Sequence, residues 1–208
     1  TLVSTNVDTA TGVANGAYAL TATASSQNGN YYTVVREGAG SNGEALTVST
    51  FGENLNSSGS EYASMSVVTI DGSLGLLSGG AASTSLPSGT HVYSGNASVV
   101  EGATDAGDGT FSLTANFNTN TADLTASTLA NVSTNNTAYF FSGTNMQINQ
   151  ADGSFSTSNG LIGVTGGASE SASVKGYFAG TNAQGVHGTA YTNDTSSPDL
   201  VGGFYGSR

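Results

Sequence analysis

The sequence predicts an all-β protein: an eight-stranded antiparallel up-and-down barrel preceded by a small, handle-like β-sheet domain. Apolar and polar residues alternate over short stretches, most clearly where Phe111, Leu113, Ala115 and Phe117 share one side of a strand, as in a sheet with one buried face. Pairs typical of tight turns separate such stretches at short intervals. They are Asn28-Gly29, Asn42-Gly43, Asp71-Gly72, Asp108-Gly109, Asp152-Gly153 and Asn159-Gly160.

The composition also favours a folded β protein over a disordered chain. Hydrophobic residues make up only 37% of the 208 residues, and 30 residues are Gly. Disordered chains are poor in aromatic and β-branched residues, whereas this one has 9 Tyr and 8 Phe among many Val, Ile and Thr. The length suffices for one large domain or two small ones.

Pro87 marks the expected boundary between a small β domain at 1–85 and a barrel at 88–208. We expect a strand to end at Leu74–Leu77, and we expect the small residues at 78–83 to form a linker. Strands of the first domain are expected near 17–24, 31–36, 44–51 and 61–70. Eight strands, enough for a barrel to close around an interior filled by side chains, are expected near 90–101, 110–117, 121–130, 137–148, 154–163, 172–179, 184–192 and 200–206.

Charge and cysteine usage exclude several classes of protein. Arg36, Lys175 and Arg208 are the only basic residues against 14 acidic ones, giving a formal net charge of −11. Nucleic-acid binding is excluded because it depends on neutralising phosphates with Lys and Arg. Without Cys there are no disulfides and no thiolate metal sites, and no stretch reaches the apolar length of a transmembrane helix.

The same composition indicates where the protein works. Richness in Ser, Thr, Asn, Gly and Ala with a single Lys is typical of secreted and surface-exposed bacterial proteins. We therefore expect an extracellular or bacterial outer-surface location, and a mature form from which a signal sequence has been removed.

Motifs near the C-terminus identify a family. They are Gly176-Tyr177-Phe178-Ala179-Gly180, the turn Asn182-Ala183, Gly188, and the last strand Gly202–Arg208. This order resembles the terminal signature of the transferrin-binding protein B type β-barrel: a G-x-F-x-G strand, an Asn-Ala turn, a Gly-containing strand and a final G-x-F-x-G-x-R strand. Tyr93–Gly95 and Gly109–Phe117 resemble earlier strands of that barrel, so the resemblance covers about residues 88–208. Its signature residues are Gly176, Phe178, Gly180, Gly202, Phe204 and Gly206.

The signature has a physical meaning besides the resemblance. Gly at alternate positions lets neighbouring strands and inward-pointing aromatic rings approach closely in a tight barrel wall. Phe178 and Phe204 are then expected to fill the barrel interior.

The resemblance also implies a function. Members of the family are exported, often as surface lipoproteins, and capture host proteins or haem-bearing ligands through loops and a handle domain. This chain lacks the lipid-bearing Cys, and Gln184-Gly185-Val186 replaces the acidic residue common after the Asn-Ala turn, so no binding-site detail is carried over. The expectation is an exported, non-catalytic binding protein that captures a protein or haem-like ligand.

The sequence gives little support for catalysis or metal binding. His91 and His187 are the only histidines; we favour a structural role for each, with haem or metal ligation as the alternative. No His-x-x-x-His, Glu-x-x-His or Gly-x-Ser-x-Gly motif occurs, so we expect no enzyme. Thr104–Gly109 is the best calcium candidate, but an ordinary hairpin turn is favoured there. No metal site and no cofactor are predicted, and haem is kept only as the alternative.

Two further features leave alternatives open. Tyr31-Tyr32 and Tyr139–Phe141 offer aromatic side chains for binding, with packing as the favoured role. The N-terminal arm Thr1–Asp8 alternates at Val3, Thr5 and Val7, so it can add as a strand to another copy in an extracellular filament or surface layer. The favoured alternative is a frayed terminus or an edge strand of the chain's own sheet. The expected partners are therefore an extracellular protein, a haem-like ligand or copies of the chain itself.

Overall fold

The computed structural model describes residues 2–3, 18–39, 44–101, 104–130, 138–193 and 200–208. Within these residues the regular structure is entirely β-strand, which confirms the all-β class. None of the described residues forms a helix that is long and apolar enough to span a membrane.

The first part of the chain forms a six-stranded antiparallel sheet whose strands are neighbours in chain order. Its strands are β1 (Leu2–Val3), β2 (Tyr18–Asn28), β3 (Tyr31–Ala39), β4 (Ala45–Asn54), β5 (Tyr62–Ile70) and β6 (Ser73–Gly80). Ser78–Gly80 belongs to β6, so the expected linker at 78–83 begins too early. Asp71 and Gly72 both have positive φ, 46° and 84°, as a tight hairpin turn requires.

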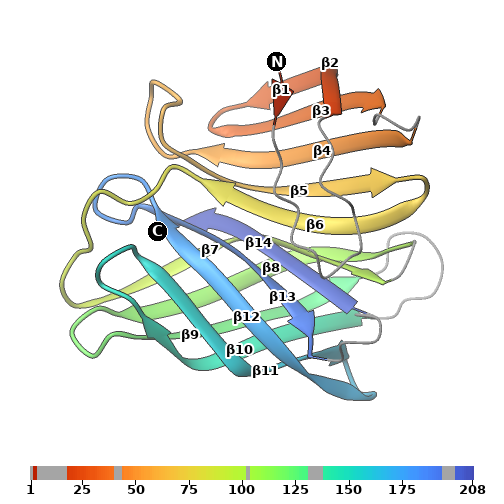
Figure 1. The fold of residues 1–208 in the computed structure, drawn as a ribbon. Helices are drawn as coiled ribbons and strands as arrows, with labels where there is room; N and C mark the ends of the chain where they lie inside the picture. The colour runs from red at the N-terminus through yellow and green to blue at the C-terminus, as the bar shows by residue number, and fades with distance from the viewer. Residues whose placement is uncertain (1, 4–17, 40–43, 102–103, 131–137, 194–199) are drawn as a thin grey trace.

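The second part forms a closed antiparallel barrel of eight strands, as predicted. The strands are β7 (Thr90–Glu101), β8 (Thr104–Asn116), β9 (Thr121–Ala130), β10 (Ala138–Ile148), β11 (Ser154–Val164), β12 (Ser169–Ala179), β13 (Gly185–Thr192) and β14 (Leu200–Ser207). The last strand closes the barrel on the first, from Leu200 opposite Glu101 to Ser207 opposite Ser94. Figure 1 shows the sheet lying along one side of this barrel.

Two of the predicted turns are wrong. Asp108-Gly109 lies within β8 and Asn159-Gly160 within β11, and the strand register shifts at each of them. Gly is common at such irregularities as well as in turns. An Asp-Gly or Asn-Gly pair by itself therefore does not distinguish a turn from an irregularity within a strand. Thr104–Gly109 is accordingly strand, so the hairpin turn favoured for this segment is wrong, and it is not the flexible loop of the calcium alternative either. Asn42-Gly43 lies outside the described residues.

Aromatic rings fill the barrel interior. Phe111, Phe141, Phe155, Phe178 and Phe204 are all buried in one hydrophobic core. The centroid of the Phe178 ring lies 5.1 Å from that of Phe155, and the centroid of the Phe204 ring lies 5.1 Å from that of Phe111. The prediction that Phe178 and Phe204 fill the interior is confirmed, and the barrel is a packed core rather than a container.

One face of the sheet packs on the outside of the barrel. Ala63, Met65 and Leu76 from the sheet form a second buried cluster with Tyr205 and other residues of the barrel wall. Beyond β6, Ala82 makes a single bridge to Ala179 at the end of β12. The sheet is therefore joined to the barrel by packing as well as by the chain.

Candidate functional site

A turn of the barrel is held by a carboxylate from the sheet. Glu61 accepts hydrogen bonds from the backbone N–H of Thr181 at 3.0 Å and from its hydroxyl at 2.5 Å. These bonds lower the pKa of Glu61, because they favour the ionised carboxylate. Gly180, with φ of 74°, starts this turn in a conformation that suits glycine. This signature glycine therefore serves the turn between β12 and β13.

The last residue of the signature ties the barrel end together. Arg208 donates a hydrogen bond to the carbonyl of Asn182 at 2.9 Å and another to Nδ1 of His91 at 2.6 Å. Asn182 and Ala183 both have positive φ, as expected for the Asn-Ala turn. Burial raises the pKa of Tyr93 to about 12, and its hydroxyl donates to the carbonyl of Ala183 at 2.7 Å. These contacts support a structural role for the C-terminal motif.

His187 lies between the barrel and the sheet. It is 7% exposed, its Nδ1 is 3.1 Å from the Ser78 hydroxyl, and its ring stacks on Tyr177. Burial lowers its pKa to about 4, because the charged imidazolium is disfavoured away from water. A Cβ on Gly80 would meet the His187 ring at 2.6 Å. An incoming haem iron would therefore have to displace β6 to reach this side chain.

His91 is placed at the end of the barrel, away from His187. Since its Nδ1 accepts from Arg208, its Nε2 is the donor to the Ser88 carbonyl at 3.0 Å. Its ring also contacts Phe117. Among the described residues, no group of three or more His, Asp or Glu side chains is arranged to hold a metal ion.

The predicted aromatic candidates divide between core and surface. Phe141 belongs to the barrel core, and Tyr139 is buried with its hydroxyl donating to Glu101 at 2.9 Å. The Tyr32 ring lies directly over Gly52. Of these five aromatic residues only Tyr31 is exposed, at 50%, so it is the one best placed to meet a partner.

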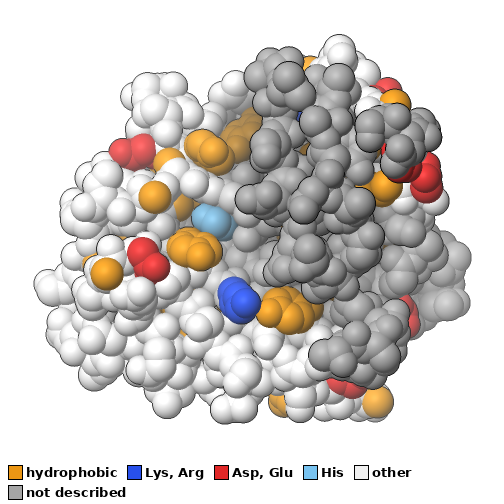
Figure 2. All heavy atoms as spheres, viewed as in Figure 1, with side chains coloured by type: hydrophobic (Ala, Val, Ile, Leu, Met, Phe, Trp, Pro, Cys, Tyr) orange, Lys and Arg blue, Asp and Glu red, His pale blue; other side chains and the backbone are white. Residues whose placement is uncertain are grey.

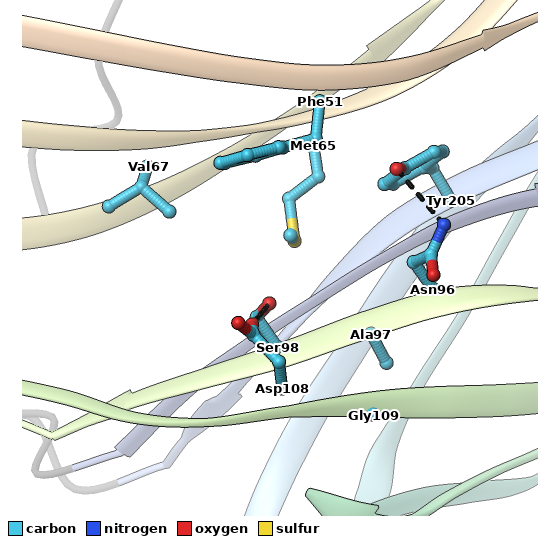
Figure 3. Close-up of a pocket in the computed structure, with 9 residues that line it drawn as sticks. All are labelled: Phe51, Met65, Val67, Asn96, Ala97, Ser98, Asp108, Gly109 and Tyr205. Atoms are coloured by element: carbon cyan, nitrogen blue, oxygen red, sulfur yellow. Dashed lines mark hydrogen bonds between the residues drawn. The ribbon is translucent and has the colours of Figure 1, made fainter. Parts of the chain in front are cut away.

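A pocket of about 260 Å³ lies where the sheet and the barrel diverge. Phe51, Met65 and Val67 form its sheet side, and Tyr205 and the outer surfaces of β7 and β8 form the barrel side (Figure 3). Two hydrogen bonds organise the barrel side. Asn96 donates to the Tyr205 hydroxyl at 3.0 Å, and the Ser98 hydroxyl donates to Oδ1 of Asp108. One wall is thus apolar, and the other offers a carboxylate, an amide and two hydroxyls.

A second carboxylate is buried near this pocket. Glu53 is 8% exposed and accepts a hydrogen bond from Ser207 at 3.0 Å, while its Oε2 has no hydrogen-bond partner among the described residues. Burial raises the pKa of Glu53. Burial also raises the pKa of Tyr205. The negative charge of the nearby Glu53 raises this pKa further, by a smaller amount. Tyr31 pairs with Glu53 across β3 and β4, so both side chains point toward the barrel side of the sheet.

Glu53 and Glu61 are expected to affect stability with opposite dependence on pH. Because the folded pKa of Glu53 is raised, its charge costs stability as pH rises from the ordinary value of about 4.3 through the folded pKa. The folded pKa of Glu61 is lowered, so its contribution is present above that ordinary value and is lost as pH falls through the folded pKa.

We therefore expect Glu53→Gln to stabilise the protein at about pH 7 by on the order of 1 kcal/mol, and by less at about pH 4. Urea unfolding at both values measures this difference. Glu61→Gln is the matched control, and we expect it to be no more stable than the wild type at about pH 7. An equal effect of Glu53→Gln at both values would contradict the raised pKa.

No protein-family model matches the chain, and no curated protein matches it either. The likeness to the transferrin-binding protein B type barrel thus rests on the motifs quoted above. What the structure shows is the fold: a closed eight-stranded antiparallel barrel with a separate antiparallel sheet beside it.

Sequence reasoning missed the pocket. Its lining comes from β4, β5, β7, β8 and β14, and no short motif marks residues that meet only through the packing of sheet on barrel. The only sequence pattern that pointed to it is the alternation of Asn96 and Ser98 along β7, which predicts polar side chains on the outside of the barrel. On the face shown in Figure 2, acidic side chains are spread out and a histidine lies beside hydrophobic side chains.

Proposed function

We propose that the protein is an exported, non-catalytic binding protein that captures an extracellular protein on its outer surface. The packed barrel interior is the observation that carries this proposal. Six Phe rings occupy the space in which an open barrel would hold a small molecule. Because the interior is filled, we expect binding on the outer surface of the molecule, where the pocket and the exposed Tyr31 lie on the same side of the sheet.

The size of the pocket favours one anchoring group of a larger partner over a whole cofactor. At about 260 Å³ it is below the range of roughly 300–1,000 Å³ typical of pockets that enclose a drug-sized ligand. Pockets of this size accept single anchor side chains at protein interfaces. Haem is less well supported, because neither His91 nor His187 lines this pocket.

Photo-crosslinking tests the proposal. A photoreactive phenylalanine placed at Tyr31 is expected to give one discrete crosslinked protein when the purified chain is mixed with the fluid surrounding its producing cells. The same group at Leu161, which is 44% exposed on the barrel wall, is the control and is expected to give none. Equal labelling from both positions, or none from either, would contradict capture on the Tyr31 side of the sheet.

The alternative function is a structural subunit of an extracellular filament or surface layer assembled by strand addition. In the structure Leu2 and Val3 pair with Ala19 and Tyr18 of the chain's own sheet, while Thr5 and Val7 lie outside the described residues. Light scattering and electron microscopy of the unheated, cell-released protein separate the two functions. Particles with the mass of a single chain favour the binding protein, and filaments or sheets favour the subunit.

A further inference from the structure

We infer that the pocket between sheet and barrel binds a lysine or arginine side chain presented by the captured protein. The inference rests on the proposed function, and it names the chemistry of the partner. The occupant follows from the two walls of the pocket, from their charge, and from where the chain's own basic residues are placed.

The apolar wall suits an aliphatic stem. Phe51, Met65 and Val67 lie on the sheet face that points toward the barrel, and the Met65 side chain extends down toward it (Figure 3). Lys and Arg bury their methylene stems against such surfaces while the charged head reaches a polar partner. The Phe51 and Tyr205 rings add faces that attract a cation.

The polar wall suits a cationic head. Asp108 supplies a carboxylate whose Oδ1 is fixed by the Ser98 hydroxyl, so that Oδ2 is the oxygen to accept from a bound cation. The Tyr205 hydroxyl, which is itself held by Asn96, provides a further acceptor. A purely apolar ligand would strip water from these groups without replacing their hydrogen bonds. An anionic ligand would be repelled by the Asp108 carboxylate.

None of the chain's own cations occupies this position. The pocket lining contains no Lys or Arg. Arg208 is engaged at the barrel end with His91 and Asn182, and Lys175 lies over the Tyr191 ring at 5.8 Å. Arg36 lies on β3 opposite Val48. With a net charge of −11, the whole molecule also attracts basic partners and repels acidic ones.

n-Butylguanidinium is the probe, because it carries the stem and head of arginine without a protein attached. Two-dimensional NMR of the isotope-labelled full chain follows its binding. We expect saturable shifts at the amides of Met65, Val67, Ser98 and Asp108, with a dissociation constant on the order of 1 mM. Neutral n-butylurea and anionic pentanoate are expected to bind at least about fivefold more weakly.

Two variants and one control test the site. Asp108→Asn keeps an oxygen that can accept from Ser98 and is expected to weaken probe binding about fivefold or more. Val67→Phe fills the pocket and is expected to abolish binding. Glu170→Gln changes the net charge equally, at an exposed position of β12 that does not line the pocket, and is expected to change binding less than about twofold.

Equal binding of butylguanidinium and butylurea, or no effect of Asp108→Asn, would overturn the inference. Shifts confined to residues outside the pocket lining would overturn it as well. None of these results touches the proposed function, because crosslinking at Tyr31 reports protein capture without using the pocket. Conversely, charge-dependent probe binding without any crosslinked partner would leave the site in place and remove the proposed function.

Discussion

Phe204→Ala is expected to destabilise the barrel by about 3–5 kcal/mol, the range for removing a fully buried aromatic ring. The Phe204 side chain is fully buried and packs against Phe111, Phe141 and Phe155 from three other strands. Alanine leaves a cavity that a closed barrel wall cannot collapse to fill. Since whole domains are stable by roughly 5–15 kcal/mol, we expect a large drop in the urea midpoint, measured by circular dichroism.

Leu161→Ala is the matched control for this experiment. Leu161 lies on the same barrel but is 44% exposed, so its truncation is expected to cost less than about 1 kcal/mol. A cost for Phe204→Ala as small as that of Leu161→Ala would mean that the interior is not packed as described. It would also remove the argument that places ligand binding outside the barrel.

The strand order of the barrel could be predicted because local patterns dictate it. Along β8, Phe111, Leu113 and Ala115 point inward, and the alternation is visible in the chain without any knowledge of neighbours. Turns with positive φ, such as Asp71-Gly72 and Asn182-Ala183, are equally local. With short hairpins between consecutive strands, the register follows from the turns and the buried face.

Features that depend on packing between distant segments could not be predicted in this way. Where the structure has β6, the sequence predicts the end of a strand followed by a linker, because Ser78–Gly80 lacks the bulky residues of a strand. In the structure the small residues are needed there, since a Cβ on Gly80 would strike His187 of the barrel. The pocket also depends on packing between distant segments. Phe51 of the sheet and Asp108 of the barrel line it from opposite sides, and the sequence around either residue does not predict a binding site.

Phe141 and Gly202 offer the second large expected effect, as a coupled pair. A Cβ on Gly202 would lie 2.7 Å and 2.8 Å from two ring atoms of Phe141, and all three of its nearest neighbours belong to that ring. We expect Gly202→Ala alone to cost about 1–3 kcal/mol through overpacking. Phe141→Leu alone is expected to cost on the order of 1 kcal/mol through lost volume.

Combined in one chain, these two changes are expected to be less harmful than their sum, with a coupling of on the order of 1 kcal/mol. The smaller leucine vacates the space that the new methyl group requires, so each change compensates for the other. Gly75→Ala is the control, because none of the described residues has an atom within 4 Å of its would-be Cβ, and it is expected to change stability by less than about 0.5 kcal/mol. Strict additivity in a double-mutant cycle of urea unfolding would show that this signature glycine is not there to admit the ring. The G-x-F-x-G pattern would then lose its physical explanation at Gly202.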